Sequence, residues 1–107
     1  MTVDPETLGE KERQIYDELK EVTDPEIGAS IIDMGLVDEI SVKGDEARVT
    51  YHLTMPMCPP QMALLIGSSI KKKLFKIGGF SKMDVQVSDH YFKDQINKAL
   101  DEMKLEN

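Results

Sequence analysis

Apolar residues recur at helical intervals in three parts of the chain, and residues that start or stop helices bound these parts. The first part follows Thr7-Leu8-Gly9-Glu10, which has the spacing of a capping box. The second begins at Pro59 or Pro60, because proline suits the first position of a helix, and it ends at Gly78-Gly79. The third is the C-terminal end of the chain. The predicted helices cover residues 8–22, 59–77 and 91–107.

Apolar and polar residues alternate in three further segments, as side chains do in strands. Residues 36–42 and 47–55 flank Lys43-Gly44-Asp45-Glu46, which predicts a tight turn, and residues 83–87 form the third segment. Alternate side chains of a strand point to opposite faces of a sheet, so one set in the second strand should face the core. That set comprises Ala47, Val49, Tyr51, Leu53 and Met55.

The element order α-β-β-α-β-α predicts an α+β domain, with a three-stranded mixed sheet covered by helices on one face. A helical crossover makes the third strand parallel to the second. Residues 27–35 are expected to form a loop with local helical turns. The 107 residues suffice for one hydrophobic core. We therefore expect residues 1–107 to form a single domain, with residues 1–7 flexible and residues 91–107 a C-terminal helix.

Charge is distributed unevenly around the net value of −7: residues 1–46 hold 14 acids and 4 bases, whereas residues 47–107 hold 6 acids and 9 bases. The acidic excess argues against broad nucleic-acid binding, which requires many phosphate contacts. No apolar run approaches the ~18 residues of a membrane span, and the first residues are acidic. We expect a cytoplasmic protein that binds neither membrane nor nucleic acid. The one basic cluster is interpreted as the solvated face of a helix, or alternatively as a docking site for an acidic partner, and comprises Lys71, Lys72, Lys73 and Lys76.

The single cysteine, Cys58, stands between the predicted second strand and the helix that follows it. We expect it in or near the N-cap position, where free N–H groups favour the thiolate by ~0.3–1 kcal/mol. Two prolines follow and stiffen the backbone. The alternative that Cys58 is a small buried hydrophobic residue stays open. One thiol and two histidines cannot complete a closed four-ligand metal site, so any cluster must be shared between chains.

The remaining polar candidates have structural interpretations beside their functional ones. His52 is expected on the solvated face of its strand, and His90 could fold toward the same end of the sheet as Cys58. A Cys–His pair would suit a thiol enzyme, although no third orienting residue is evident. On their own residues, Asp24 is interpreted as a helix cap and Asp33 as a turn former before Gly35.

Three motifs occur in order along the chain, and together they resemble a known family. They are Asp24-Pro25-Glu26-Ile27-Gly28, Ile32-Asp33-Met34-Gly35-Leu36-Val37 and Leu53-Thr54-Met55-Pro56-Met57-Cys58-Pro59. This set resembles the iron-sulfur cluster assembly domain family, first catalogued as domain of unknown function 59, which includes SufT-like and PaaD-like proteins. Each motif is weak alone, but three in this order are specific. The similarity extends from about Ile15 to Val87.

The resemblance implies a small α+β domain that helps to deliver or assemble iron-sulfur clusters on recipient proteins, rather than a conventional enzyme. It implies that Cys58 is the functional thiol and a transient ligand of a labile cluster. It further implies recipient proteins and a cluster-carrier P-loop ATPase, or other assembly factors, as partners; this chain has no GxxxxGK[ST] motif of its own. The other residues carried over as candidates that form the site are Asp24, Glu26, Asp33, Thr54 and Pro59.

The chain departs from the family after the third predicted strand. Many relatives continue with a proline-and-tryptophan segment, whereas this chain reads Asp89-His90-Tyr91-Phe92 and has no tryptophan. We expect Tyr91 or Phe92 to take the aromatic place. Two alternatives remain: an accessory subunit or adaptor that docks on an oxygenase or on a cluster-carrier ATPase, and a thiol enzyme that uses Cys58 with His90 or His52. A homodimer is expected because a three-stranded sheet has open edges.

Overall fold

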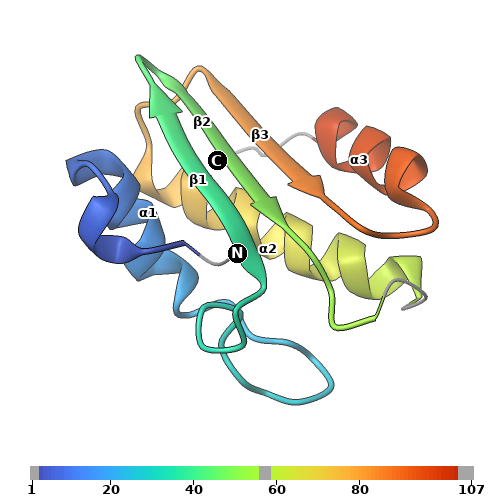
Figure 1. Cartoon of the computed structure of the whole chain (residues 1–107). Coiled ribbons are helices and arrows are strands. Elements are labelled where there is room, and N and C mark those ends of the chain that lie inside the picture. The colour runs from blue at the N-terminus through green and yellow to red at the C-terminus, as the bar shows by residue number, and fades with distance from the viewer. Residues whose placement is uncertain (1–2, 56–58, 104–107) are drawn as a thin grey trace.

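Three helices lie on one face of a three-stranded sheet in the computed structural model of the chain, which describes residues 3–55 and 59–103 (Figure 1). The predicted α+β class and the order α-β-β-α-β-α are confirmed. A short 3-10 helix, η1, precedes them. The elements are η1 (Pro5–Thr7), α1 (Glu10–Leu19), β1 (Val37–Lys43), β2 (Glu46–Tyr51), α2 (Pro60–Ile77), β3 (Lys82–Val87) and α3 (Lys93–Glu102).

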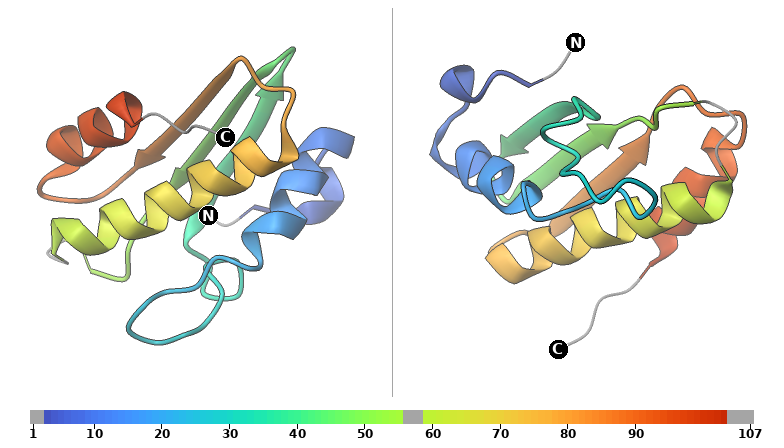
Figure 2. Two further views of the ribbon diagram at one scale, coloured as in Figure 1. Left: turned by 180° about the vertical axis from the view of Figure 1, so that it is seen from behind. Right: turned by 90° about the horizontal axis from the view of Figure 1, so that it is seen from below.

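The sheet has the order β1-β2-β3, with β2 in the centre. β1 pairs antiparallel with β2 through a turn at Gly44, whose φ of 60° favours glycine. β2 and β3 run parallel, as predicted, because α2 connects them by crossing one face of the sheet (Figure 2). The sheet is therefore mixed.

The core lies between the sheet and α2. The apolar stripe predicted for α2 is fully buried, and four of the five residues predicted to face inward from β2 and its extension are buried as well. Met55 is the exception, with 60% of its surface exposed. The prediction was wrong because β2 ends at Tyr51, so the alternation of a strand no longer determines where Met55 points. The buried residues of the stripe are Ala63, Ile66, Ile70 and Leu74.

The first helix begins later than the capping-box spacing predicted. Gly9 is its N-cap residue, and its N–H donates to Glu12 Oε1 at 3.1 Å. Thr7 instead belongs to η1, where its hydroxyl donates to the carbonyl of Asp4 at 2.8 Å. The other carboxylate oxygen of Glu12 accepts from the backbone N–H of Val42 at 2.9 Å. One side chain thus caps α1 and fastens it to the edge of β1.

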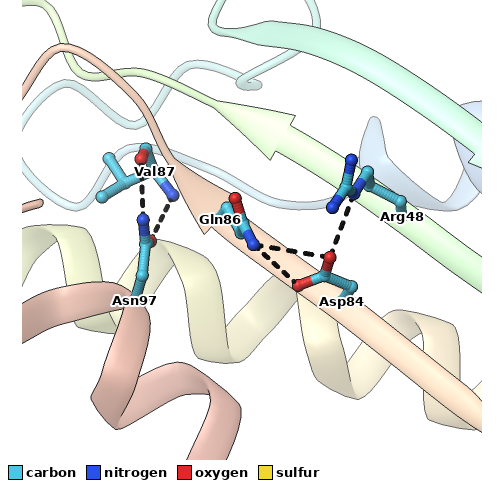
Figure 3. Close-up of polar contacts among 5 residues, drawn as sticks. All are labelled: Arg48, Asp84, Gln86, Val87 and Asn97. Atoms are coloured by element: carbon cyan, nitrogen blue, oxygen red, sulfur yellow. Dashed lines mark hydrogen bonds and ion pairs between the residues drawn. The ribbon is translucent and has the colours of Figure 1, made fainter. Parts of the chain in front are cut away.

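The final helix is α3, which covers Lys93–Glu102. It begins two residues later than predicted, and residues 104–107 of the predicted helix lie outside the described residues. Ile96 and Leu100 are buried against the sheet and α2. Asn97 lies beside the outer edge of β3, where its amide oxygen accepts from the N–H of Val87 at 2.7 Å and its amide nitrogen donates to the carbonyl of Val87 at 3.2 Å (Figure 3). The Asn97 side chain therefore pairs with β3 as a neighbouring strand would.

The interpretation of the basic cluster of α2 as a solvated face was wrong for Lys71, whereas Lys72 and Lys76 are exposed and Lys73 is partly exposed. Lys71 is only 6% exposed, and its ammonium donates to the carbonyls of Leu100 at 2.6 Å and Met103 at 3.1 Å. These carbonyls lie at the C-terminal end of α3, where a cation is favoured. Lys73 and Lys76 form ion pairs with acids of the segment that begins at α1, at 3.3 to 3.6 Å, and those acids are Glu18 and Glu21.

Tyr51 makes the free energy of unfolding depend on pH. Its side chain is fully buried, and its hydroxyl donates to the carbonyl of Ala63 at 2.6 Å. Burial raises the pKa of Tyr51 well above its usual value of 10.0. The unfolded chain therefore loses this proton at a lower pH than the folded chain, so the free energy of unfolding should fall by up to about 1.4 kcal/mol for each pH unit above the usual value.

Tyr51→Phe should remove this part of the pH dependence, because phenylalanine does not ionise. Urea denaturation of both proteins between neutral and strongly alkaline pH measures the difference. Tyr91→Phe is the matched control, since Tyr91 is 71% exposed and should behave as the unaltered protein does. Parallel curves for the unaltered protein and Tyr51→Phe would contradict the prediction.

Candidate functional site

The three sequence motifs converge on one end of the sheet. β2 and β3 both finish there, β1 starts there, and the N-terminal end of α2 lies beside them (Figure 1). A bridge between Thr23 and Ser30 joins the base of the first motif to the start of the second. The second motif is then joined to the residue just before the third, because the N–H of His52 donates to the carbonyl of Leu36 at 2.9 Å. Segments distant in sequence thus form one surface.

The first motif is a loop held by the side chain of Asp24. This carboxylate is buried, and its Oδ1 accepts from the N–H groups of Glu26 at 2.8 Å and Ile27 at 3.2 Å. The loop turns back at Gly28, whose N–H donates to the carbonyl of Asp24 at 2.7 Å. Asp24 therefore shapes the loop, whereas Glu26 is exposed at its tip.

The second motif ends in a sharp turn at Gly35, whose φ is 70°. Asp33 precedes this turn and is exposed, at a hollow it shares with Tyr16 and Val37. Thr54, from the third motif, lines a different cleft. The candidate residues therefore share one end of the molecule without meeting in one pocket.

The third motif bridges β2 and α2. Thr54 is exposed, and Pro59 is exposed at the N-cap position, so α2 begins at Pro60. Cys58, the predicted thiol, lies outside the described residues. Its expected position in or near the N-cap therefore stays a prediction, with Pro59 as the N-cap residue itself.

An open cleft lies beside the third motif, between the segments that follow β2 and β3. Its lining includes Thr54, His90 and Tyr91. His90 is buried, and its Nδ1 accepts from the N–H of Phe92 at 3.0 Å. The side chain thus does fold toward the end of the sheet that carries the third motif, while its pairing with Cys58 stays a prediction.

Sequence reasoning missed a polar cluster at the same end of the sheet. His52 Nδ1 lies 2.9 Å from Asp38 Oδ1, and the hydroxyl of Ser88 donates to Asp38 Oδ2 at 3.0 Å. The register of β1 against β2 shifts between Val37 and Glu39, which leaves Asp38 outside the regular pairing. Such a bulge redirects a side chain, and no motif in the sequence marks it. His52 is therefore anchored, rather than freely solvated as expected.

Large apolar side chains are exposed around this end of the molecule. They occur in the first motif, the third motif, the first half of α2 and the segment after β3. Exposed side chains of this kind are available for contact with another protein. These residues are Ile27, Met55, Leu65, Tyr91 and Phe92.

The part of the chain that the structure describes contains neither a metal-holding group of residues nor a membrane-spanning helix. No group of three or more His, Cys, Asp or Glu residues is placed to hold a metal ion there. Among the helices of the same residues, none is both long and apolar enough to span a bilayer.

Comparison with known proteins gives consistent matches. Residues 12–87 match the model of a family described as iron-sulfur cluster assembly protein. An uncharacterized protein of Methanocaldococcus jannaschii is 36% identical over 90 residues, which are 82% of this chain and 92% of that protein. Cytosolic iron-sulfur assembly component 2B of Mus musculus is 30% identical over 112 residues, covering 90% of this chain and 68% of that protein.

Among solved structures, a domain of unknown function DUF59 from Bacillus anthracis superposes with a TM-score of 0.66 at 29% identity, covering 86% of this chain and 92% of that one. The matched residues 12–87 contain all three motifs and Cys58. The chain therefore belongs to the iron-sulfur cluster assembly protein family, of the type catalogued as domain of unknown function 59.

Proposed function

We propose that this chain is an assembly or targeting factor that helps to deliver iron-sulfur clusters to recipient proteins, with the Cys58 thiolate as a transient iron ligand or as the contact to a cluster carrier. The family match carries the proposal, because it spans the three motifs and the single cysteine. The chain then acts as a delivery factor of the SufT-like or PaaD-like kind, not as a conventional enzyme. The name of the mouse relative supports a cytoplasmic location.

A single thiol per chain makes the proposed cargo labile. A typical cluster takes four cysteine ligands, so two copies of this chain would supply only half of them. The remaining ligands come from a partner or from a small thiol. A cluster held in this way leaves readily, which suits transfer and does not suit storage.

The proposed partners are a recipient protein and a separate P-loop ATPase or another assembly factor, with a homodimer as a further prediction. The exposed apolar residues at the motif end offer these proteins a contact surface, with Leu65, Tyr91 and Met55 more than half exposed. The basic cluster contributes less to this surface, because Lys71 is buried and Lys73 and Lys76 form ion pairs with acids of the same chain.

Anaerobic reconstitution tests the proposal. The protein is incubated with iron, sulfide and a small thiol, and the resulting chromophore is offered to an apo acceptor enzyme. Because the chain has one cysteine, alkylation with iodoacetamide blocks Cys58 selectively. We expect the unmodified protein to form a visible chromophore that activates the acceptor faster than the small thiol alone, and the alkylated protein to do neither.

The accessory-subunit alternative predicts a different result. A folded protein that forms no chromophore, yet captures one stable oxygenase or ATPase partner before and after alkylation, would support an adaptor and contradict the carrier. The exposed apolar residues are the observation that favours this alternative. In the thiol-enzyme alternative, a histidine that pairs with Cys58 would have to do so through Nε2, because Nδ1 of both His52 and His90 already makes a hydrogen bond within the chain.

A further inference from the structure

Three strands bring a carboxylate, an imidazole and a hydroxyl together at the motif end. Asp38 comes from the bulge in β1, His52 follows β2 directly, and Ser88 follows β3 directly. Each oxygen of the Asp38 carboxylate has its own partner, His52 Nδ1 at 2.9 Å and the Ser88 hydroxyl at 3.0 Å. The backbone N–H of Ser88 also donates to the carbonyl of Tyr51 at 2.7 Å, so the cluster is tied to the sheet.

This arrangement determines which nitrogen of His52 carries the proton. A carboxylate only accepts hydrogen bonds, so neutral His52 must hold its proton on Nδ1. The lone pair then belongs to Nε2. No residue within the described part of the chain makes a hydrogen bond to Nε2. About one third of the His52 side chain is exposed, and it borders the open cleft shared with Thr54 and Asp89.

We propose that His52 binds a divalent transition-metal ion through Nε2, with Asp38 and Ser88 as positioning residues. Histidines that bind metals almost always donate the other ring N–H to a carboxylate or carbonyl, which orients the ring and raises its basicity. Neutral imidazole suits iron, cobalt and zinc, whereas Mg²⁺ prefers oxygen ligands. That Fe²⁺ is the ion bound in the cell rests on the proposed function.

The proposed site leaves coordination positions of the metal ion open. No three residues in the described ranges form a metal-holding group, so an ion on His52 keeps positions for water, a small thiol or a partner's side chain. The exposed carboxylate of Asp89 is the charged neighbour in the same cleft. Weak and exchangeable binding follows, which suits an ion in transit and not a resident cofactor.

Co²⁺ binding to the full chain carrying Cys58→Ala tests this proposal, because the substitution removes the thiol that would also bind the ion. Two-dimensional ¹H–¹⁵N spectra of the histidine side chains report the tautomer and the atom that meets the metal. We expect His52 to be protonated on Nδ1 before addition, and its Nε2 signal to be shifted or broadened by Co²⁺ but not by Mg²⁺. If Co²⁺ shifted or broadened the Nδ1 signal of His52 and left its Nε2 signal unchanged, the proposal would be overturned.

Variants then separate ligand from positioning residue. His52→Gln should abolish the binding measured by Co²⁺ visible absorption, and Asp38→Asn should weaken it by roughly tenfold. Glu39→Gln, the same kind of change one residue away on β1, is the matched control and should leave binding unchanged. Equal affinity in His52→Gln would refute the site. The spectra of the unaltered histidine decide the question even if a variant misfolds.

The test of the His52 site and the test of the proposed function can give different results. Co²⁺ binding at His52, in a protein whose cysteine-dependent chromophore never forms, would keep the metal site and reject the carrier. Cluster transfer by Cys58 with no ion at His52 would do the reverse.

Discussion

Cys58→Ala is expected to reduce cluster transfer to the rate seen with the small thiol alone, while the free energy of unfolding stays close to that of the unaltered protein. Transfer is lost because no other cysteine can replace the thiolate. The fold is retained because α2 begins after this position, at Pro60, and is held by buried residues from Ala63 onward. Acceptor activation and urea denaturation, measured on the same samples, check both parts.

Cys58→Ser sharpens the test. Serine preserves the size of the side chain but replaces a soft sulfur ligand by a hydroxyl that does not ionise at neutral pH, so transfer should again be lost. Ser68→Ala, on the partly exposed face of α2, is the control for a small change nearby and should transfer normally. Full transfer by Cys58→Ser would contradict the role of the thiolate.

Gly67→Ala should destabilise the protein by about 2–3 kcal/mol, although alanine is normally the better helix former by about 1 kcal/mol. Gly67 lies where α2 approaches both the sheet and α3. A Cβ atom there would lie 2.6 Å from the Tyr51 hydroxyl and 2.7 and 2.8 Å from the two terminal methyl groups of Leu100. Tyr51 is held by its bond to Ala63, and Leu100 is buried, so neither can move freely.

Urea denaturation measures this change, with an unaltered dependence on denaturant showing that the folded state is otherwise the same. Tyr51→Phe removes one of the crowded atoms, so the cost of Gly67→Ala should be smaller in that background than in the unaltered protein. Ser68→Ala again serves as control and should change the free energy of unfolding by less than about 0.5 kcal/mol. A stabilising Gly67→Ala would show that α2 has more room than the structure indicates.

Sequence pattern predicted the elements best where periodicity and boundary residues agreed. α2 is the clearest case, since its apolar stripe, Pro60 and Gly78 all indicated the same helix. Prediction failed where the position of a side chain depends on how separate elements are placed in the fold. Lys71 was placed on the surface by its charge, but the end of α3 supplies the carbonyls that receive it. Met55 was placed in the core by an alternation that stops when β2 ends at Tyr51.

The site was predicted in part for a related reason. The motifs identified which segments matter, and the topology brings these segments to one end of the sheet. The role of Asp24 in holding its own loop follows from local chemistry and was foreseeable. The contact between His52 and Asp38 was not, because it depends on a shift in strand register that no local sequence pattern marks.

The side chains of Glu12 and Asn97 have a consequence for how copies of this protein can associate. One binds the edge of β1 at Val42, and the other binds the edge of β3 at Val87. An incoming strand would have to displace them to extend the sheet at either point, since their hydrogen bonds occupy the groups it needs. At these positions the protein resists growth into a continuous β-polymer, so self-association there would have to use surfaces other than strand pairing.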